Sequence, residues 1–194
     1  MNEWQLQSHL THQWTKNPLI HKDRKFYLIA WELMFPSWGI NRNTGKWNEV
    51  SVDFILFDGE KTFLCLELKN EIKSRKPLLS AYCQASHRTS LFIEQYDREK
   101  MQRAQEDCFS SNDARALKNQ VNFIPSFSFP KTPKVISVLA ARRFPHNAED
   151  QVERWNSMPL DEMKVEIQQY TPTKEMKRFM DMTASKQRVE MIVV

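Results

Sequence analysis

The feature that most constrains this chain is a strand-forming run from Asn48 to Ser74 that contains three charged side chains. Its first half alternates along the chain and is rich in β-branched and aromatic residues, which predicts a strand. Asp58-Gly59 is typical of a tight turn. The nearly unbroken apolar segment that follows predicts a second strand, buried on both faces. The run therefore predicts a β-hairpin.

The three ionisable residues in this hairpin are Asp53, Glu67 and Lys69. Burying such groups without partners is costly, so each must be paired, exposed at a sheet edge, or bound to a metal. Glu67 and Lys69 are two apart on one strand and point to the same face. They could form a surface salt bridge at an exposed edge. We favour a functional site, because both follow a segment that looks wholly buried and Asp53 interrupts an apolar strand.

The hairpin register decides whether the two carboxylates meet. A two-residue turn at Asp58-Gly59 would pair Asp53 with Leu64 and leave Glu67 on the other face. A three-residue loop, 59–61, would set Asp53 directly opposite Glu67. Both loop lengths are common, so the sequence leaves the register open. If the carboxylates meet, they form a site for a hard divalent cation, and the lysine could orient or activate a water.

At these residues the chain resembles the PD-(D/E)XK nucleases, the restriction-endonuclease-like superfamily. The match is Val52-Asp53 on the first strand and Glu67-Leu68-Lys69 on the second, with Val52 where the family usually has proline. Many members also carry a glutamate on the helix before the hairpin, and several carry a polar residue, often Gln, on the helix after it. Glu32 and Gln84 stand in those places.

The resemblance implies a metal-dependent nuclease that hydrolyses phosphodiester bonds, with DNA favoured over RNA. Mg²⁺, or Mn²⁺ in its place, would be held by Asp53, Glu67 and the backbone carbonyl of Leu68. Glu32 would complete a second metal position. Lys69 would position or deprotonate the attacking water, and Gln84 would face the active site.

The spacing of apolar residues, and the residues that typically begin and end helices and strands, predict the remaining elements. The fold expected from them is α/β, with one domain in which helices flank a central mixed sheet. The resemblance further implies a restriction-endonuclease-like core at about 22–145, followed by an α/β extension at 146–194. The expected elements are a helix over 2–15, a buried helix over 22–35 ended by Pro36, a helix from Pro77 through Glu106, a strand at Val135–Ala141, a helix at Ala148–Ser157, a strand at Lys164–Tyr170, a helix at Thr173–Met182 and a strand at Val189–Val194.

Two further segments have more than one interpretation. On the helix after the hairpin, His87 and Arg88 are weaker site candidates than Gln84, because helix surfaces commonly carry such residues. The segment 122–131 has three phenylalanines beside prolines and basic residues. These rings could stack on unpaired bases, but packing on the core is the favoured interpretation.

Composition sets wider limits. The chain has 194 residues, 41% hydrophobic and 27% charged, which is ordinary for a globular domain, and its net charge of +4 is compatible with nucleic-acid binding. Three widely spaced cysteines show neither metal spacing nor a disulfide framework, so we expect an intracellular, cytoplasmic protein. No run reaches the length of a membrane span, and no membrane partner is expected. Two other hypotheses stay open: an inactive nucleic-acid-binding or protein-interaction module on the same fold, and a nuclease that works as a homodimer or within a larger complex.

Overall fold

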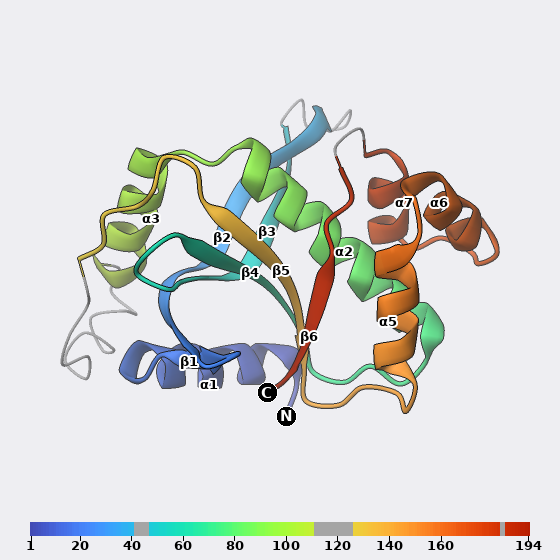
Figure 1. Cartoon of the computed structure of the whole chain (residues 1–194), viewed down its shortest axis with the longest axis horizontal. Coiled ribbons are helices and arrows are strands. Elements are labelled where there is room, and N and C mark those ends of the chain that lie inside the picture. The colour runs from blue at the N-terminus through green and yellow to red at the C-terminus, as the bar shows by residue number, and fades with distance from the viewer. Residues whose placement is uncertain (41–46, 111–125, 183–184) are drawn as a thin grey trace.

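The computed structural model describes residues 1–40, 47–110, 126–182 and 185–194, and its centre is a six-stranded sheet with the strands in chain order (Figure 1). Neighbours from β1 to β4 are antiparallel, whereas β5 is parallel to β4 and β6 is parallel to β5. The strands are β1 (Leu19–His21), β2 (Arg24–Ile40), β3 (Trp47–Phe57), β4 (Thr62–Lys69), β5 (Lys134–Ala141) and β6 (Val189–Val193). The prediction of an α/β fold with a central mixed sheet flanked by helices is confirmed.

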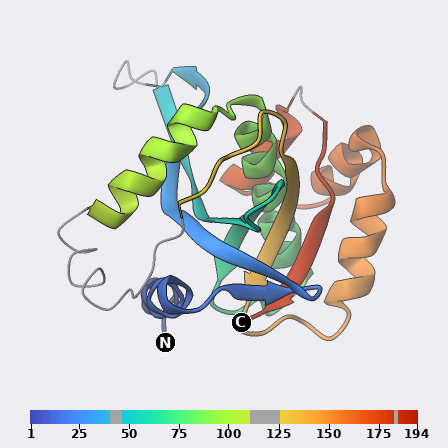
Figure 2. The same ribbon diagram turned by 60° about the vertical axis from the view of Figure 1, so that its left-hand side comes forward.

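Helices cover both faces of this sheet (Figures 1 and 2). On one face, α1 buries Leu6, Leu10 and Trp14 against the strands, while α2 covers the other face through two larger apolar clusters. Within the described residues, no helix combines the length and the apolar character needed to cross a membrane. The helices are α1 (Glu3–Lys16), α2 (Arg75–Glu94), α3 (Arg98–Ser110), α5 (Ala148–Ser157), α6 (Leu160–Gln168) and α7 (Lys174–Met180).

The central hairpin adopts the register that sets Asp53 opposite Glu67. Phe54 pairs with Leu66, and the backbone N–H of Asp58 donates to the Thr62 carbonyl at 3.1 Å. The Asp58 side chain stabilises the loop, because its Oδ1 accepts hydrogen bonds of 2.9 Å from three successive backbone N–H groups, at residues 60–62. Of the two registers left open by the sequence, the structure therefore has the one with the longer loop.

The helix predicted over 22–35 is wrong, because residues 24–35 belong to the long strand β2. It pairs with β1 on one side and with β3 on the other, and it continues through Pro36, which lies opposite Glu49. A dense apolar run has no clear period, so the sequence fits a buried strand as well as a buried helix. Backbone pairing with β3 makes this segment a strand, and most of the paired residues are distant from each other in sequence.

Two other expectations also differ from the structure. The predicted helix from Pro77 through Glu106 is broken into α2 and α3, since Asp97 accepts a hydrogen bond from the backbone N–H of Lys100 and starts a new helix. The strand predicted at Lys164–Tyr170 is wrong, because 160–168 is the helix α6. Met163 and Ile167, four residues apart, are fully buried there, whereas Val165 is 59% exposed.

The remaining predicted elements are confirmed where the structure describes them. The helix predicted over 2–15 is α1, and the strand predicted at Val135–Ala141 is β5. The helices predicted at Ala148–Ser157 and Thr173–Met182 are α5 and α7, and the strand predicted at Val189–Val194 is β6. In the phenylalanine-rich segment, Phe127 and Phe129 pack on Phe57 with ring centroids 5.5 and 5.3 Å away. This confirms the favoured interpretation for these two rings, while Phe123 lies outside the described residues.

Candidate active site

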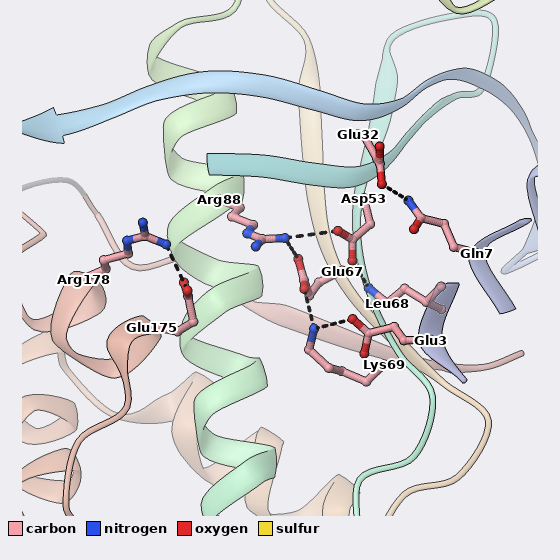
Figure 3. A network of polar contacts seen from close by, with 10 residues as sticks. All are labelled: Glu3, Gln7, Glu32, Asp53, Glu67, Leu68, Lys69, Arg88, Glu175 and Arg178. Carbon is pink, nitrogen blue, oxygen red and sulfur yellow. Dashed lines mark hydrogen bonds and ion pairs between the residues drawn. The ribbon is translucent and has the colours of Figure 1, made fainter. Parts of the chain in front are cut away.

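The carboxylates of Asp53 and Glu67 lie next to each other and contact the same cation (Figure 3). Glu67 follows Phe63 and Cys65 on the face of β4 that α2 covers, and Asp53 stands opposite it on β3. Arg88, on α2, reaches this point from above the sheet. Its Nη1 lies 3.2 Å from Oδ1 of Asp53 and also contacts Oε2 of Glu67.

Each of the four carboxylate oxygens has a partner. Besides the two that contact Arg88, Oδ2 of Asp53 accepts a hydrogen bond of 2.8 Å from the backbone N–H of Leu68. The remaining oxygen, Oε1 of Glu67, accepts one of 2.8 Å from Nζ of Lys69. Two acids and two bases thus form one connected network, in which the charged forms balance.

Burial shapes the electrostatics of this network. The Glu67 side chain is only 2% exposed, and burial raises its pKa to about 8. Repulsion from Asp53 adds to the rise, and attraction to Lys69 and Arg88 opposes it. Burial by itself would lower the pKa of Lys69, but attraction to Glu67, the hydrogen bond to Glu67 and attraction to Glu3 and Asp53 together outweigh it, so the pKa of Lys69 is raised. The cations beside Glu67 therefore stabilise its ionised form against the effect of burial.

The start of α1 borders the same network. Oε1 of Glu3 lies 3.5 Å from Nζ of Lys69, and the side-chain amide of Asn70 donates to the Met1 carbonyl at 2.7 Å. Asn2 caps the helix in a capping box with Gln5, which holds this first turn in place. Lys69 consequently has a carboxylate on either side, one from its own strand and one from α1.

Glu32 is not on a helix, as the resemblance implied, but in the middle of β2. It falls between the paired positions Trp31–Phe54 and Leu33–Val52, so in the register it lies beside Asp53. Its φ is 50°, a left-handed conformation that is unusual for glutamate within a strand. The side chain points toward α1, where Oε1 accepts a hydrogen bond of 3.3 Å from Nε2 of Gln7 (Figure 3).

A groove of about 680 Å³ lies between α1 and β2, and Glu32 forms part of its wall. Trp4, which is 71% exposed, is at the same groove. The Glu32 side chain therefore faces this groove and not the point where the Asp53 and Glu67 oxygens converge. The groove is lined by Trp4, Gln7, Ser8, His9, Thr11, His12, Trp31 and Glu32.

The site includes Arg88, which the sequence ranked below Gln84. Gln84 is on α2 one turn earlier and is mostly buried, but it makes none of the described hydrogen bonds to Asp53, Glu67 or Lys69. The signal that could have indicated Arg88 is its spacing, because residues four apart lie on the same face of a helix. A buried acid pair needs a cation, and Arg88 is the base on that face.

The donor set suits a hard divalent cation. Among the described residues, no group of three or more His, Cys, Asp and Glu side chains is arranged so that it could hold a metal ion. Mg²⁺ does not need such a cage, since it is commonly held by one or two carboxylates together with waters and substrate oxygens. Asp53 and Glu67 satisfy that requirement. Leu68 contributes its N–H to Asp53 in the structure, and a role for its carbonyl stays a prediction.

Comparison with known protein families, with curated proteins and with solved structures finds no match to this chain.

Proposed function

We propose that this protein is a Mg²⁺-dependent nuclease that hydrolyses phosphodiester bonds of nucleic acid, with DNA as the favoured substrate. The observation that carries the proposal is the convergence of one oxygen from Asp53 and one from Glu67 on a single cationic atom, with Lys69 beside them. Two acids and one lysine at one point of two adjacent strands form the constellation expected of a PD-(D/E)XK site. A mixed sheet with helices on both faces is consistent with a restriction-endonuclease-like core.

Each residue has a defined part in this proposal. Asp53 and Glu67 would hold the cation, and the Leu68 N–H keeps the Asp53 carboxylate oriented by its hydrogen bond. When bound, Mg²⁺ would polarise the phosphodiester and lower the pKa of a coordinated water. The Lys69 ammonium, held by Glu67 at 2.8 Å, orients the attacking water and stabilises negative charge that develops on the phosphate.

Cleavage assays test this proposal directly. Purified wild-type protein, Asp53→Asn and Lys69→Ala are incubated with plasmid, linear duplex, single-stranded DNA and RNA, in Mg²⁺, Mn²⁺ or EDTA. We expect cleavage by the wild type that EDTA abolishes and that both variants lose by about 10²-fold or more. Lys61→Ala, at an exposed lysine of the hairpin loop, is the matched control and should cleave normally.

The results also separate the proposed function from its alternative. Cleavage that is equal in the wild type and in both variants would place the chemistry elsewhere. Binding of nucleic acid without cleavage of any substrate would favour an inactive module. The observation that favours this alternative is the Arg88 contact, since a guanidinium between two acids is also found in purely structural ion pairs.

A further inference from the structure

The Arg88 guanidinium makes an unusual contact with the acid pair. A single nitrogen, Nη1, contacts one oxygen of Asp53 and one oxygen of Glu67. An arginine that pairs with a carboxylate frequently uses its planar fork to donate two parallel hydrogen bonds to it. Here Nη1 instead lies between two carboxylates, as a bridging cation does.

Among the described residues, the hydrogen bonds of the Arg88 guanidinium go to these two carboxylates. Its Nε atom is buried and has no hydrogen-bond partner in the part of the chain that the structure describes. Its side chain is only 12% exposed, so the guanidinium is removed from water while part of its hydrogen-bonding capacity is unused. Such a group is held mainly by the two carboxylates.

Charge balance makes Arg88 and a divalent cation alternatives at this position. In their charged forms Asp53 and Glu67 carry two negative charges and Lys69 and Arg88 carry two positive charges, so these four side chains balance; the Glu3 carboxylate beside Lys69 is about half exposed to water. A divalent cation added to this set would leave two excess positive charges in a largely buried site, which is costly. If Arg88 departs, the excess falls to one, and a phosphodiester could neutralise that charge.

We propose that Arg88 is the resident counter-cation of the acid pair, which competes with the divalent metal for Asp53 and Glu67 and leaves them when the metal binds. This inference rests on the proposed function, because it requires that the acid pair binds a divalent cation. Arg88 is thus a positioning residue that holds the two carboxylates together in the metal-free protein and lowers their affinity for metal.

Metal titration tests the competition without using activity as the readout. Mn²⁺ binding is measured by calorimetry for wild type, Arg88→Met and Arg178→Met. Methionine keeps much of the length of the side chain and removes its charge. Arg178, on α7, is the matched control, because it is a mostly buried helical arginine that pairs with Glu175 at 2.9 Å, away from the acid pair (Figure 3).

We expect Arg88→Met to bind Mn²⁺ at least about tenfold more tightly than the wild type, because the substitution removes the arginine that competes with the metal for Asp53 and Glu67. Arg178→Met should bind within about twofold of the wild type. Equal or weaker binding by Arg88→Met, with normal binding and cleavage by the wild type, would overturn the inference and leave the proposed function intact. Absence of Mn²⁺ binding in the wild type and in both variants would overturn both.

A second measurement on the wild type keeps the inference testable if Arg88→Met does not fold. The ¹⁵N-labelled arginine side chains are followed by NMR as Mg²⁺ is added, with Arg88→Lys used to assign the Arg88 signal. We expect the Arg88 Nε–H resonance to move on saturation with Mg²⁺ and the Arg178 resonance to stay. An Arg88 resonance that does not move while Mg²⁺ binds would contradict displacement.

Discussion

Oδ2 of Asp53 accepts a hydrogen bond of 2.8 Å from the backbone N–H of Leu68, just beyond the last paired residues of β3 and β4. This bond connects the two central strands where their backbone ladder ends, and it fixes the orientation of the Asp53 carboxylate. Asp53 therefore contributes to the stability of the hairpin as well as to the proposed metal site.

Substitution at Asp53 should separate these two contributions. Asp53→Asn keeps an oxygen that can accept from Leu68, whereas Asp53→Ala leaves that N–H without its acceptor. We expect Asp53→Ala to lower the free energy of unfolding by about 1–3 kcal/mol more than Asp53→Asn. Both variants should lose cleavage. Urea unfolding followed by circular dichroism measures the difference, and equal stabilities would show that the Leu68 bond contributes little.

Glu32 should matter less for cleavage than its place in the register suggests. Its carboxylate accepts from Gln7 of α1, whereas the Asp53 and Glu67 oxygens converge on Arg88. We expect Glu32→Ala to reduce the Mg²⁺-dependent cleavage rate by less than about tenfold, which corresponds to 1.4 kcal/mol of barrier.

Gln7→Ala is the matched control for this prediction, because it removes the partner and leaves the carboxylate. If Glu32 instead serves the second metal position implied by the resemblance, Glu32→Ala should cleave as poorly as Asp53→Ala. Rates measured side by side at several Mg²⁺ concentrations distinguish the two results.

His87 should make the protein less stable in mild acid. Burial on α2 lowers the pKa of His87 to about 4, with Arg178 and Arg88 acting in the same direction and Glu175 opposing them. Between pH 6.5 and pH 4 the unfolded chain therefore binds the proton more readily than the folded protein does. We expect the free energy of unfolding to fall by about 2 kcal/mol from pH 7 to pH 5 because of this group alone.

The variant His87→Gln isolates the contribution, since every other titrating group is still present. Its stability should decline less between pH 7 and pH 5 than that of the wild type. Chemical denaturation at several pH values measures both slopes. Parallel pH profiles for the two proteins would contradict a lowered pKa of His87.

A pair of substitutions tests the assignment of 160–168 as helix α6. In a strand, Val165 and Ile167 would share a face and respond alike, but in α6 Ile167 is fully buried and Val165 is 59% exposed. We expect Ile167→Ala to cost about 2–5 kcal/mol and Val165→Ala about 0.5 kcal/mol or less. Thermal or urea unfolding gives both values, and similar losses at the two positions would favour a strand.

Local sequence determined the central hairpin and the residues it carries. β-branched and aromatic residues alternate through β3, Asp58-Gly59 marks the turn, and Glu67 and Lys69 share a face because the side chains of a strand repeat every two residues. The register also depends on the Asp58 side chain, which accepts hydrogen bonds from three backbone N–H groups and so stabilises the longer loop. That choice is what sets Asp53 opposite Glu67.

Only the tertiary structure decided which partners these residues meet. The apolar run at 22–35 is compatible with a helix or a strand until β3 pairs with it, and 164–170 alternates like a strand although α6 buries Ile167 at helical spacing. Arg88 and Gln84 share a face of α2 by spacing, but the way α2 packs on the sheet selects Arg88 for the acid pair. Short-range patterns reflect hydrogen bonding and turn geometry within a few residues, whereas strand pairing and helix docking depend on contacts between segments distant in sequence.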